Sequence, residues 1–307
     1  MGNLGSGESN MKRIVTIIGR LLLLLVICLI GISCERESPP LPDLLINIGS
    51  HRLQMHLEGK GTPTVVIEAG ITDQMENWRP LQQRIARETF IVTYNRAGYG
   101  QSEPGPLSRH CGREAEELKA LLEAASVPGP YVIVGHSLGG LNAQAFAAKY
   151  PKDVAGIVLL DPPPLSFIRG EKYTSLLALA NQMTAEWQAV ADGGTESTNP
   201  QEKARAVFFR MIASEHREMF DESAKLVSEI SSFGDTPLIV MASGKANPVF
   251  GDIAEEYQKY WIEQSRSLSH KSSKGKFILA EESTHNLYTD VPDLVVESIL
   301  SVVYQAR

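Results

Sequence analysis

The ten residues Tyr131–Gly140, YVIVGHSLGG, constrain the fold of this chain more than any other stretch. Four apolar or aromatic residues predict a strand buried on both faces, and a segment rich in helix formers follows the glycines. Ser137 is therefore predicted at a strand-to-helix corner, where its backbone angles are strained. Gly135 and Gly139 lack the Cβ atoms that would collide as strand and helix crowd together. The pattern predicts an exposed hydroxyl at a helix N-terminus, where the helix dipole favours a developing anion.

This stretch resembles the nucleophile elbow of the α/β-hydrolase-fold serine hydrolases. Four other segments resemble the same family, and together they extend from about residue 45 to the C-terminus: VVIEAG, NRAGYGQS, LLDPP and STHNLYTDVP. The resemblance implies an α/β-hydrolase fold, a mostly parallel sheet flanked by helices, with Ser137 as the nucleophile.

Predicted strands and helices alternate along the rest of the chain. After an antiparallel hairpin around Gly49-Ser50, strands are predicted within residues 63–70, 89–102, 131–134, 154–162, 236–244 and 276–284. Helices are predicted at 76–87, 113–127, 253–268 and 291–306. Such alternation indicates parallel βαβ units. The helix-rich insertion at about 163–233, after the sixth strand, is predicted to form a cap with a few aromatic side chains facing the substrate.

Length and charge exclude several classes of protein. With 307 residues and 43% hydrophobic content, the chain can form one large domain, predicted at residues 44–307. The formal charge of -7 and the lack of a Lys/Arg cluster argue against nucleic-acid binding. No Cys/His spacing suits zinc, and the predicted chemistry needs neither a metal nor another cofactor. Cys111 is predicted to be an inert, partly buried thiol.

The N-terminal residues 1–34 are predicted to be an export signal or membrane anchor, because a basic start precedes an apolar run. The run ends in G-I-S-C, which resembles the bacterial lipoprotein processing site and implies a lipid on Cys34. An uncleaved anchor and plain secretion remain alternatives. Residues 35–43 are predicted to be a Pro-rich tether. The chain is therefore expected to be exported and attached to a membrane through its N-terminus.

A serine nucleophile requires a base and an acid partner for that base. Among seven histidines, His285 alone follows the last predicted strand, and the resemblance also implies the base there. In many relatives the acid follows the strand at 236–244, but the corresponding residue here is the uncharged Asn247. Asp161, after the preceding strand, is the position that some members use instead. Asp252 and the absence of any acid are the alternatives.

Two backbone N–H groups are expected to bind the oxyanion of the intermediate. One is the amide of Leu138, directly after the nucleophile, and the other is that of Ile71. Gly70 precedes Ile71 and allows the backbone to approach closely. Arg96, in the segment NRAGYGQS, is predicted to pair with a carboxylate or a carbonyl in a structural role.

These residues predict a serine hydrolase that cleaves a small apolar carboxylic ester through a Ser-His-Asp triad and an acyl-enzyme. An aminopeptidase or amidase is one alternative, in which Glu215, Glu218 or Asp221 holds a substrate ammonium. A non-catalytic protein that binds a ligand in the pocket is another. Epoxide hydrolase and haloalkane dehalogenase chemistry are disfavoured, because those relatives need an aspartate at position 137. The acyl and alcohol groups and the oligomeric state stay open.

Overall fold

The computed structural model describes residues 42–307. The predicted export segment 1–34, with Cys34, and most of the tether 35–43 lie outside them, so these assignments stay predictions. Among the helices of residues 42–307, none combines the length and apolar character that crossing a bilayer requires.

A single eight-stranded sheet runs through the described residues in the order β1-β2-β4-β3-β5-β6-β7-β8. The strands are β1 (Leu44–Asn47), β2 (Arg52–Glu58), β3 (Thr64–Glu68), β4 (Ile91–Tyr94), β5 (Tyr131–His136), β6 (Val154–Leu160), β7 (Leu238–Ser243) and β8 (Gly275–Ala280). Only the pairs β1–β2 and β2–β4 are antiparallel. The predicted hairpin and the mostly parallel sheet are therefore confirmed.

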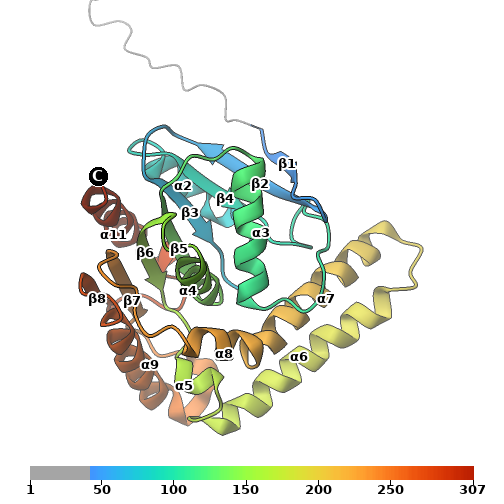
Figure 1. Ribbon diagram of the computed structural model, residues 1–307. Coiled ribbons are helices and arrows are strands. Elements are labelled where there is room, and N and C mark those ends of the chain that lie inside the picture. Colours follow the sequence, from blue (N-terminus) through green and yellow to red (C-terminus); the bar gives the residue numbers. More distant parts are fainter. Residues whose placement is uncertain (1–41) are drawn as a thin grey trace, which may run out of the picture. The chain divides into compact units, whose positions relative to one another are not determined.

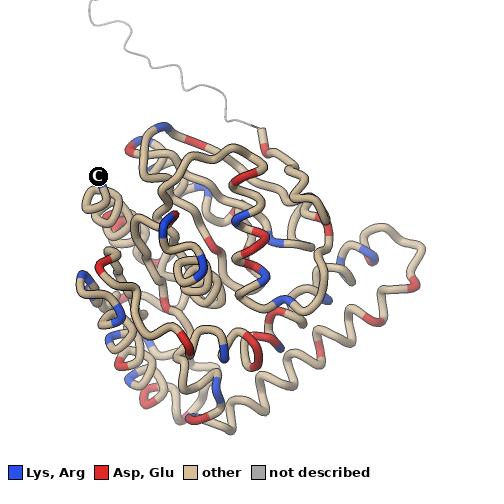
Figure 2. Tube along the Cα trace, in the orientation of Figure 1, with Lys and Arg blue, Asp and Glu red and all other residues tan. Residues whose placement is uncertain are grey.

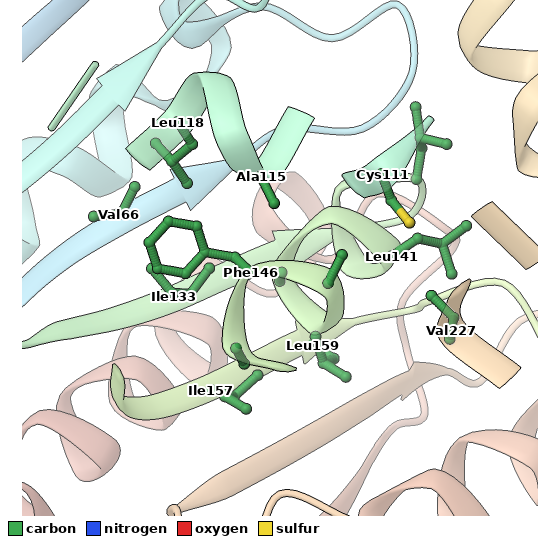
Figure 3. Close-up of a cluster of buried hydrophobic side chains, with 14 of the residues drawn as sticks. Val66, Cys111, Ala115, Leu118, Ile133, Leu141, Phe146, Ile157, Leu159 and Val227 are labelled. Carbon is green, nitrogen blue, oxygen red and sulfur yellow. The ribbon is translucent and has the colours of Figure 1, made fainter. Parts of the chain in front are cut away.

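Helices cover both faces of this sheet (Figure 1). Those outside the insertion are α2 (Arg79–Ile85), preceded by the 3-10 turn η1 (Met75–Trp78), α3 (Cys111–Ala124), α4 (Gly139–Lys149), α9 (Ala254–Ser269), preceded by η2 (Pro248–Ile253), α10 (Leu287–Asp290) and α11 (Pro292–Gln305). Successive residues of a strand point to opposite faces, which is why Ile133 packs with α3 and α4 while Val132 and Val134 pack with α2 and α11. Figure 3 shows the first of these two layers, with Phe146 of α4 against Ile133.

The insertion between β6 and β7 is wholly helical: α5 (Leu165–Ile168), α6 (Thr174–Gly194), α7 (Pro200–Met219) and α8 (Glu222–Ser228). The predicted cap after the sixth strand is thus present. The long helices α6 and α7 lie side by side as a helical hairpin (Figure 1). Figure 2 shows acidic residues in the second half of α6 and basic residues in the first half of α7, although no ion pair joins the two helices in the described residues.

Helix α7 also packs on the body of the protein, against the loop that follows β4. Met211 and Ile212 of α7 form a small buried cluster with Tyr99 of that loop. The approach is close, because a Cβ added to Gly98 would lie 2.4 Å from Met211 Cγ. Gly98 also has a φ of +79°, so a glycine is required here on both grounds. The insertion is therefore anchored beside the carboxyl end of β4.

Candidate active site

Ser137 follows β5 directly and has the strained backbone expected of it, with a φ of +52°. Its N–H donates to the carbonyl of Leu160, which ties the corner to the neighbouring strand β6 at 2.9 Å. A Cβ on Gly135 would lie 2.3 Å from Gly139 O, and a Cβ on Gly139 would lie 2.1 Å from Glu68 O. Both glycines are thus sterically required, and the predicted strand–corner–helix is confirmed. The Ser137 side chain remains partly exposed.

The loop after β3 lies against this corner. A Cβ on Gly70 would lie 3.4 Å from Ser137 Cβ and 2.9 Å from His136 Nδ1, so only glycine allows the approach. The loop thereby brings the backbone of Ile71 close to the serine. Within the described residues, the N–H groups of Ile71 and Leu138 donate to no protein acceptor. Both donors are thus available to an oxyanion, as their predicted role requires.

His285 lies on the loop after β8, and its Nδ1 donates to Asp161 Oδ2 at 2.7 Å. Since Nδ1 carries the hydrogen, the lone pair of Nε2 is left to accept a proton. The Asp161 side chain is only 3% exposed, whereas that of His285 is 38% exposed. The imidazole is therefore partly exposed to solvent, while the carboxylate that it contacts is buried.

The Asp161 carboxylate accepts two further hydrogen bonds, both from Ser243 at the end of β7. The Ser243 N–H donates to Oδ1 at 2.9 Å and its Oγ donates to Oδ2 at 3.0 Å. Gln258 of α9 in turn donates to Ser243 O at 2.7 Å. These contacts hold the charged carboxylate in one orientation. Sequence reasoning missed Ser243, although it ends the strand next to β6 and is therefore adjacent to Asp161.

The other candidate acids are not brought to His285 in the described residues. Asp252 is exposed on η2. Asn247, at the position that many relatives use, accepts a hydrogen bond from Val249 N–H at 3.0 Å and caps the same turn. The structure thus pairs His285 with Asp161, while the catalytic role of that pair stays a prediction.

His136, the residue before Ser137, contacts the loop that carries His285. The Nε2 of His136 donates to the backbone carbonyl of His285 at 2.9 Å, and the two imidazole centroids lie 4.9 Å apart. Burial, and then the nearby His285, lower the pKa of His136 to about 4. The inner imidazole therefore stays neutral. No hydrogen bond joins Ser137 Oγ to His285 in residues 42–307, and such bonds often form only when substrate is bound.

Glu215 of α7 does not have the environment expected of an ammonium-binding residue. Its side chain is fully buried, and its two oxygens bind Arg96 and Tyr99. The hypothesis that Glu215 holds a substrate ammonium is therefore wrong, because its charge is already neutralised by Arg96. Asp221 pairs with Lys225 at 2.6 Å on the surface. Arg96 contacts both a carboxylate and backbone carbonyls, which confirms its predicted pairing.

Two further side chains carry pKa values shifted by burial. Burial raises the pKa of Glu68, at the end of β3, to about 7 even though Tyr94 Oη donates to it at 2.6 Å. Burial also raises the pKa of the Cys111 thiol to about 12, which is consistent with an inert side chain. Within residues 42–307 no three His, Cys, Asp or Glu side chains are grouped to hold a metal ion.

A cavity of about 680 Å³ lies at the other end of the sheet. It is lined in part by Val154 and Ile157 of β6 and by Thr236 before β7, which belong to the amino ends of their strands. Ser137 and Asp161 follow the carboxyl ends of theirs. Since substrates of open α/β sheets bind outside the carboxyl ends, this cavity is not where the chemistry is expected.

Comparisons with known proteins agree with the fold. A family model described as alpha/beta hydrolase fold matches residues 63–236, more than half of the 307 residues. The chain is 29% identical over 248 residues to "Uncharacterized protein YqjL" of Bacillus subtilis (strain 168), covering 80% of this chain and 86% of that protein.

Among solved structures, a thermophilic esterase from Thermogutta terrifontis has a TM-score of 0.59 at 17% identity, covering 87% of this chain and 99% of that one. The epoxide hydrolase CorEH has a TM-score of 0.58 at 15% identity, with coverages of 87% and 99%. At such identities the structural likeness shows the fold alone.

Proposed function

Since the chain belongs to the α/β-hydrolase family, we propose that it is a serine hydrolase that cleaves carboxylic esters. The observation that carries this proposal is the hydrogen bond from His285 Nδ1 to the buried Asp161, beside a serine on a strained strand-to-helix corner. The proposed nucleophile, acid and base follow β5, β6 and β8 at the carboxyl end of the sheet, in the chain order Ser, Asp, His.

In the proposed mechanism Ser137 Oγ attacks the ester carbonyl while His285 Nε2 takes its proton. The amides of Leu138 and Ile71 stabilise the tetrahedral oxyanion, and Asp161 stabilises the imidazolium. The imidazolium then gives its proton to the departing alcohol, which leaves an acyl-enzyme. His285 next takes a proton from water, whose oxygen attacks the acyl carbon. Collapse of the second intermediate releases the carboxylic acid and returns the proton to Ser137.

The nucleophile supports ester rather than epoxide chemistry. When the residue at the elbow opens an epoxide as the nucleophile, it must be a carboxylate, because the ester that it forms can be hydrolysed, whereas a serine would form a stable ether. The residue at position 137 is a serine. Although an epoxide hydrolase shares the fold, acyl transfer is the reaction that this side chain can complete.

Aromatic side chains around His285 support an apolar substrate. The Trp261 ring lies 6.0 Å from the imidazole, edge to face, and contacts Tyr257. Tyr257 in turn contacts Phe167 of the insertion. Tyr257 and Phe167 are buried and support Trp261, which is partly exposed beside the imidazole. An apolar wall at this position suits an acyl chain or another small apolar group.

The test is hydrolysis of p-nitrophenyl esters of increasing acyl length by the wild-type chain and by Ser137→Ala. We expect turnover that Ser137→Ala loses by at least about 10³-fold, since the nucleophile is removed. A fluorophosphonate probe should label the wild-type serine and leave the variant unlabelled. A folded wild type that neither hydrolyses any ester nor takes up the probe would instead be a non-catalytic ligand-binding protein.

A further inference from the structure

We infer that Arg96 orients the Ile71 N–H toward the oxyanion and that Glu215, on helix α7 of the insertion, holds Arg96 in place. The helical insertion would then control the electrostatics of the reaction through α7. This inference rests on the proposed function, because it assigns positioning residues to the same oxyanion hole.

Arg96 donates hydrogen bonds to two consecutive backbone carbonyls of the loop after β3. It lies in the loop after β4, is 3% exposed, and donates from Nη1 to Ala69 O at 2.6 Å and from Nη2 to Gly70 O at 2.9 Å. Charge-assisted hydrogen bonds from a planar guanidinium are strong and directional. The guanidinium therefore fixes the orientation of both carbonyls.

Fixing the Gly70 carbonyl also fixes the Ile71 N–H, because the two groups belong to one planar peptide unit. In a trans peptide they point in opposite directions. With the carbonyl directed at Arg96, the Ile71 N–H must point away from it. The next peptide is held as well, since Thr72 N–H donates to Tyr99 Oη at 3.3 Å and Thr72 has a φ of +63°. Side chains outside the loop thus hold an otherwise unfavourable backbone.

Glu215 binds the adjacent Nε–Nη2 edge of the guanidinium, so Nη2 donates to both Glu215 and Gly70 O. Arg96 Nε donates to Glu215 Oε1 at 2.9 Å, and Arg96 Nη2 donates to Oε2 at 3.1 Å. Tyr99 Oη donates to the same Oε2 at 2.6 Å. Glu215 and Tyr99 are fully buried, so water does not compete for these bonds. The chain of contacts runs from α7 through Arg96 to the peptide of Ile71.

This arrangement makes a specific kinetic prediction. An oxyanion donor acts on charge that develops in the transition state, so misdirecting it lowers kcat with little effect on substrate binding. We expect Glu215→Gln to lower kcat about 10- to 100-fold while KM changes less than about threefold. Phenylboronic acid, which forms a tetrahedral anion on the serine, should bind more weakly by a similar factor.

Glu117→Gln is the matched control. Glu117 is buried and binds a buried arginine, Arg109, through two hydrogen bonds of 2.6 Å, but Arg109 does not contact the loop after β3 in the described residues. A general effect of weakening a buried arginine–carboxylate pair would appear in both variants alike. The inference requires Glu117→Gln to keep kcat and boronate affinity within about twofold of wild type.

Tyr99→Phe decides the question if Glu215→Gln does not fold. It removes one hydroxyl and retains the ion pair, so we expect kcat to fall about 3- to 10-fold at unchanged KM. Wild-type kcat and boronate affinity in a folded Glu215→Gln, or in Tyr99→Phe when that variant must decide, would overturn the inference and leave the proposed function intact. A wild type without any esterase turnover would overturn both.

Discussion

At the scale of single residues, Asp161 is positioned by its own strained backbone. It follows β6 with a φ of +48°, as Ser137 follows the adjacent β5 with a φ of +52°. Aspartate tolerates this left-handed region better than most residues. The turn directs the Asp161 carboxylate toward Ser243 and His285 rather than along the strand.

We expect Asp161→Asn to lower kcat about 10³- to 10⁴-fold, because a neutral amide neither stabilises the imidazolium nor holds the required tautomer. The measurement is kcat for p-nitrophenyl ester hydrolysis, with folding checked by circular dichroism. Asp252→Asn is the control and should stay near wild type, since Asp252 is exposed on η2. A loss in Asp252→Asn with an active Asp161→Asn would mean that the acid is assigned wrongly.

At the scale of elements, the crossing of β3, β5 and α4 leaves no room at the corner. The backbone of Glu68 at the end of β3 lies where a side chain on Gly139 would have to go. A Cβ at position 139 would collide with backbone atoms. Such a collision is relieved only when a strand or helix shifts, because the backbone cannot change rotamer as a side chain can.

Gly139→Ala is therefore expected to destabilise the fold by about 3 kcal/mol or more. The measurement is the free energy of unfolding from urea titration. Gly193→Ala, in the exposed part of α6 with no atom within 4 Å of the added Cβ, is the control and should stabilise by about 0.5–1 kcal/mol. Equal stability of the two variants would contradict the tight crossing at the elbow.

At the scale of the whole molecule, buried ionisable groups link stability to pH. Glu68 has a pKa of about 7 in the folded protein against 4.5 for an unperturbed glutamate, so the folded state keeps a proton that the unfolded state releases. This contribution is fully present below pH 4.5 and is lost as pH rises through 7. His136 and His216, with pKa values lowered to about 4 chiefly by burial, act in the opposite sense below pH 6.5.

We expect the free energy of unfolding of Glu68→Gln to fall less steeply than that of wild type between pH 5 and 7. The difference in slope should approach, at most, about 1.4 kcal/mol per pH unit, which corresponds to one proton. Comparing the two proteins cancels the histidine contributions. Glu281→Gln, at an exposed position, controls for the loss of one negative charge. Parallel pH profiles for wild type and Glu68→Gln would show that Glu68 does not titrate in this range.

Much of the fold could be read from the sequence because it depends on local patterns. Apolar runs and amphipathic periodicity predicted the eight strands and the long helices outside the insertion, whereas for the insertion only its helical character was predicted. The short elements η2 and α10 escaped notice, since one turn of helix carries too few residues for a periodic signal. Ser137 and its flanking glycines could also be predicted from local patterns, because their conformation depends only on the strand before them and the helix after them.

By itself, the sequence determined the fold class, the elbow with Ser137 and, through chain order, His285 as the candidate base. Only the tertiary structure decided which carboxylate contacts His285, because Asp161 and Asp252 both follow strands and differ in where their loops lead. The contacts of Glu215 could not be predicted from the sequence either, since 119 residues separate it from Arg96. Contacts between distant residues depend on how elements pack in three dimensions, and no periodicity along the chain records that packing.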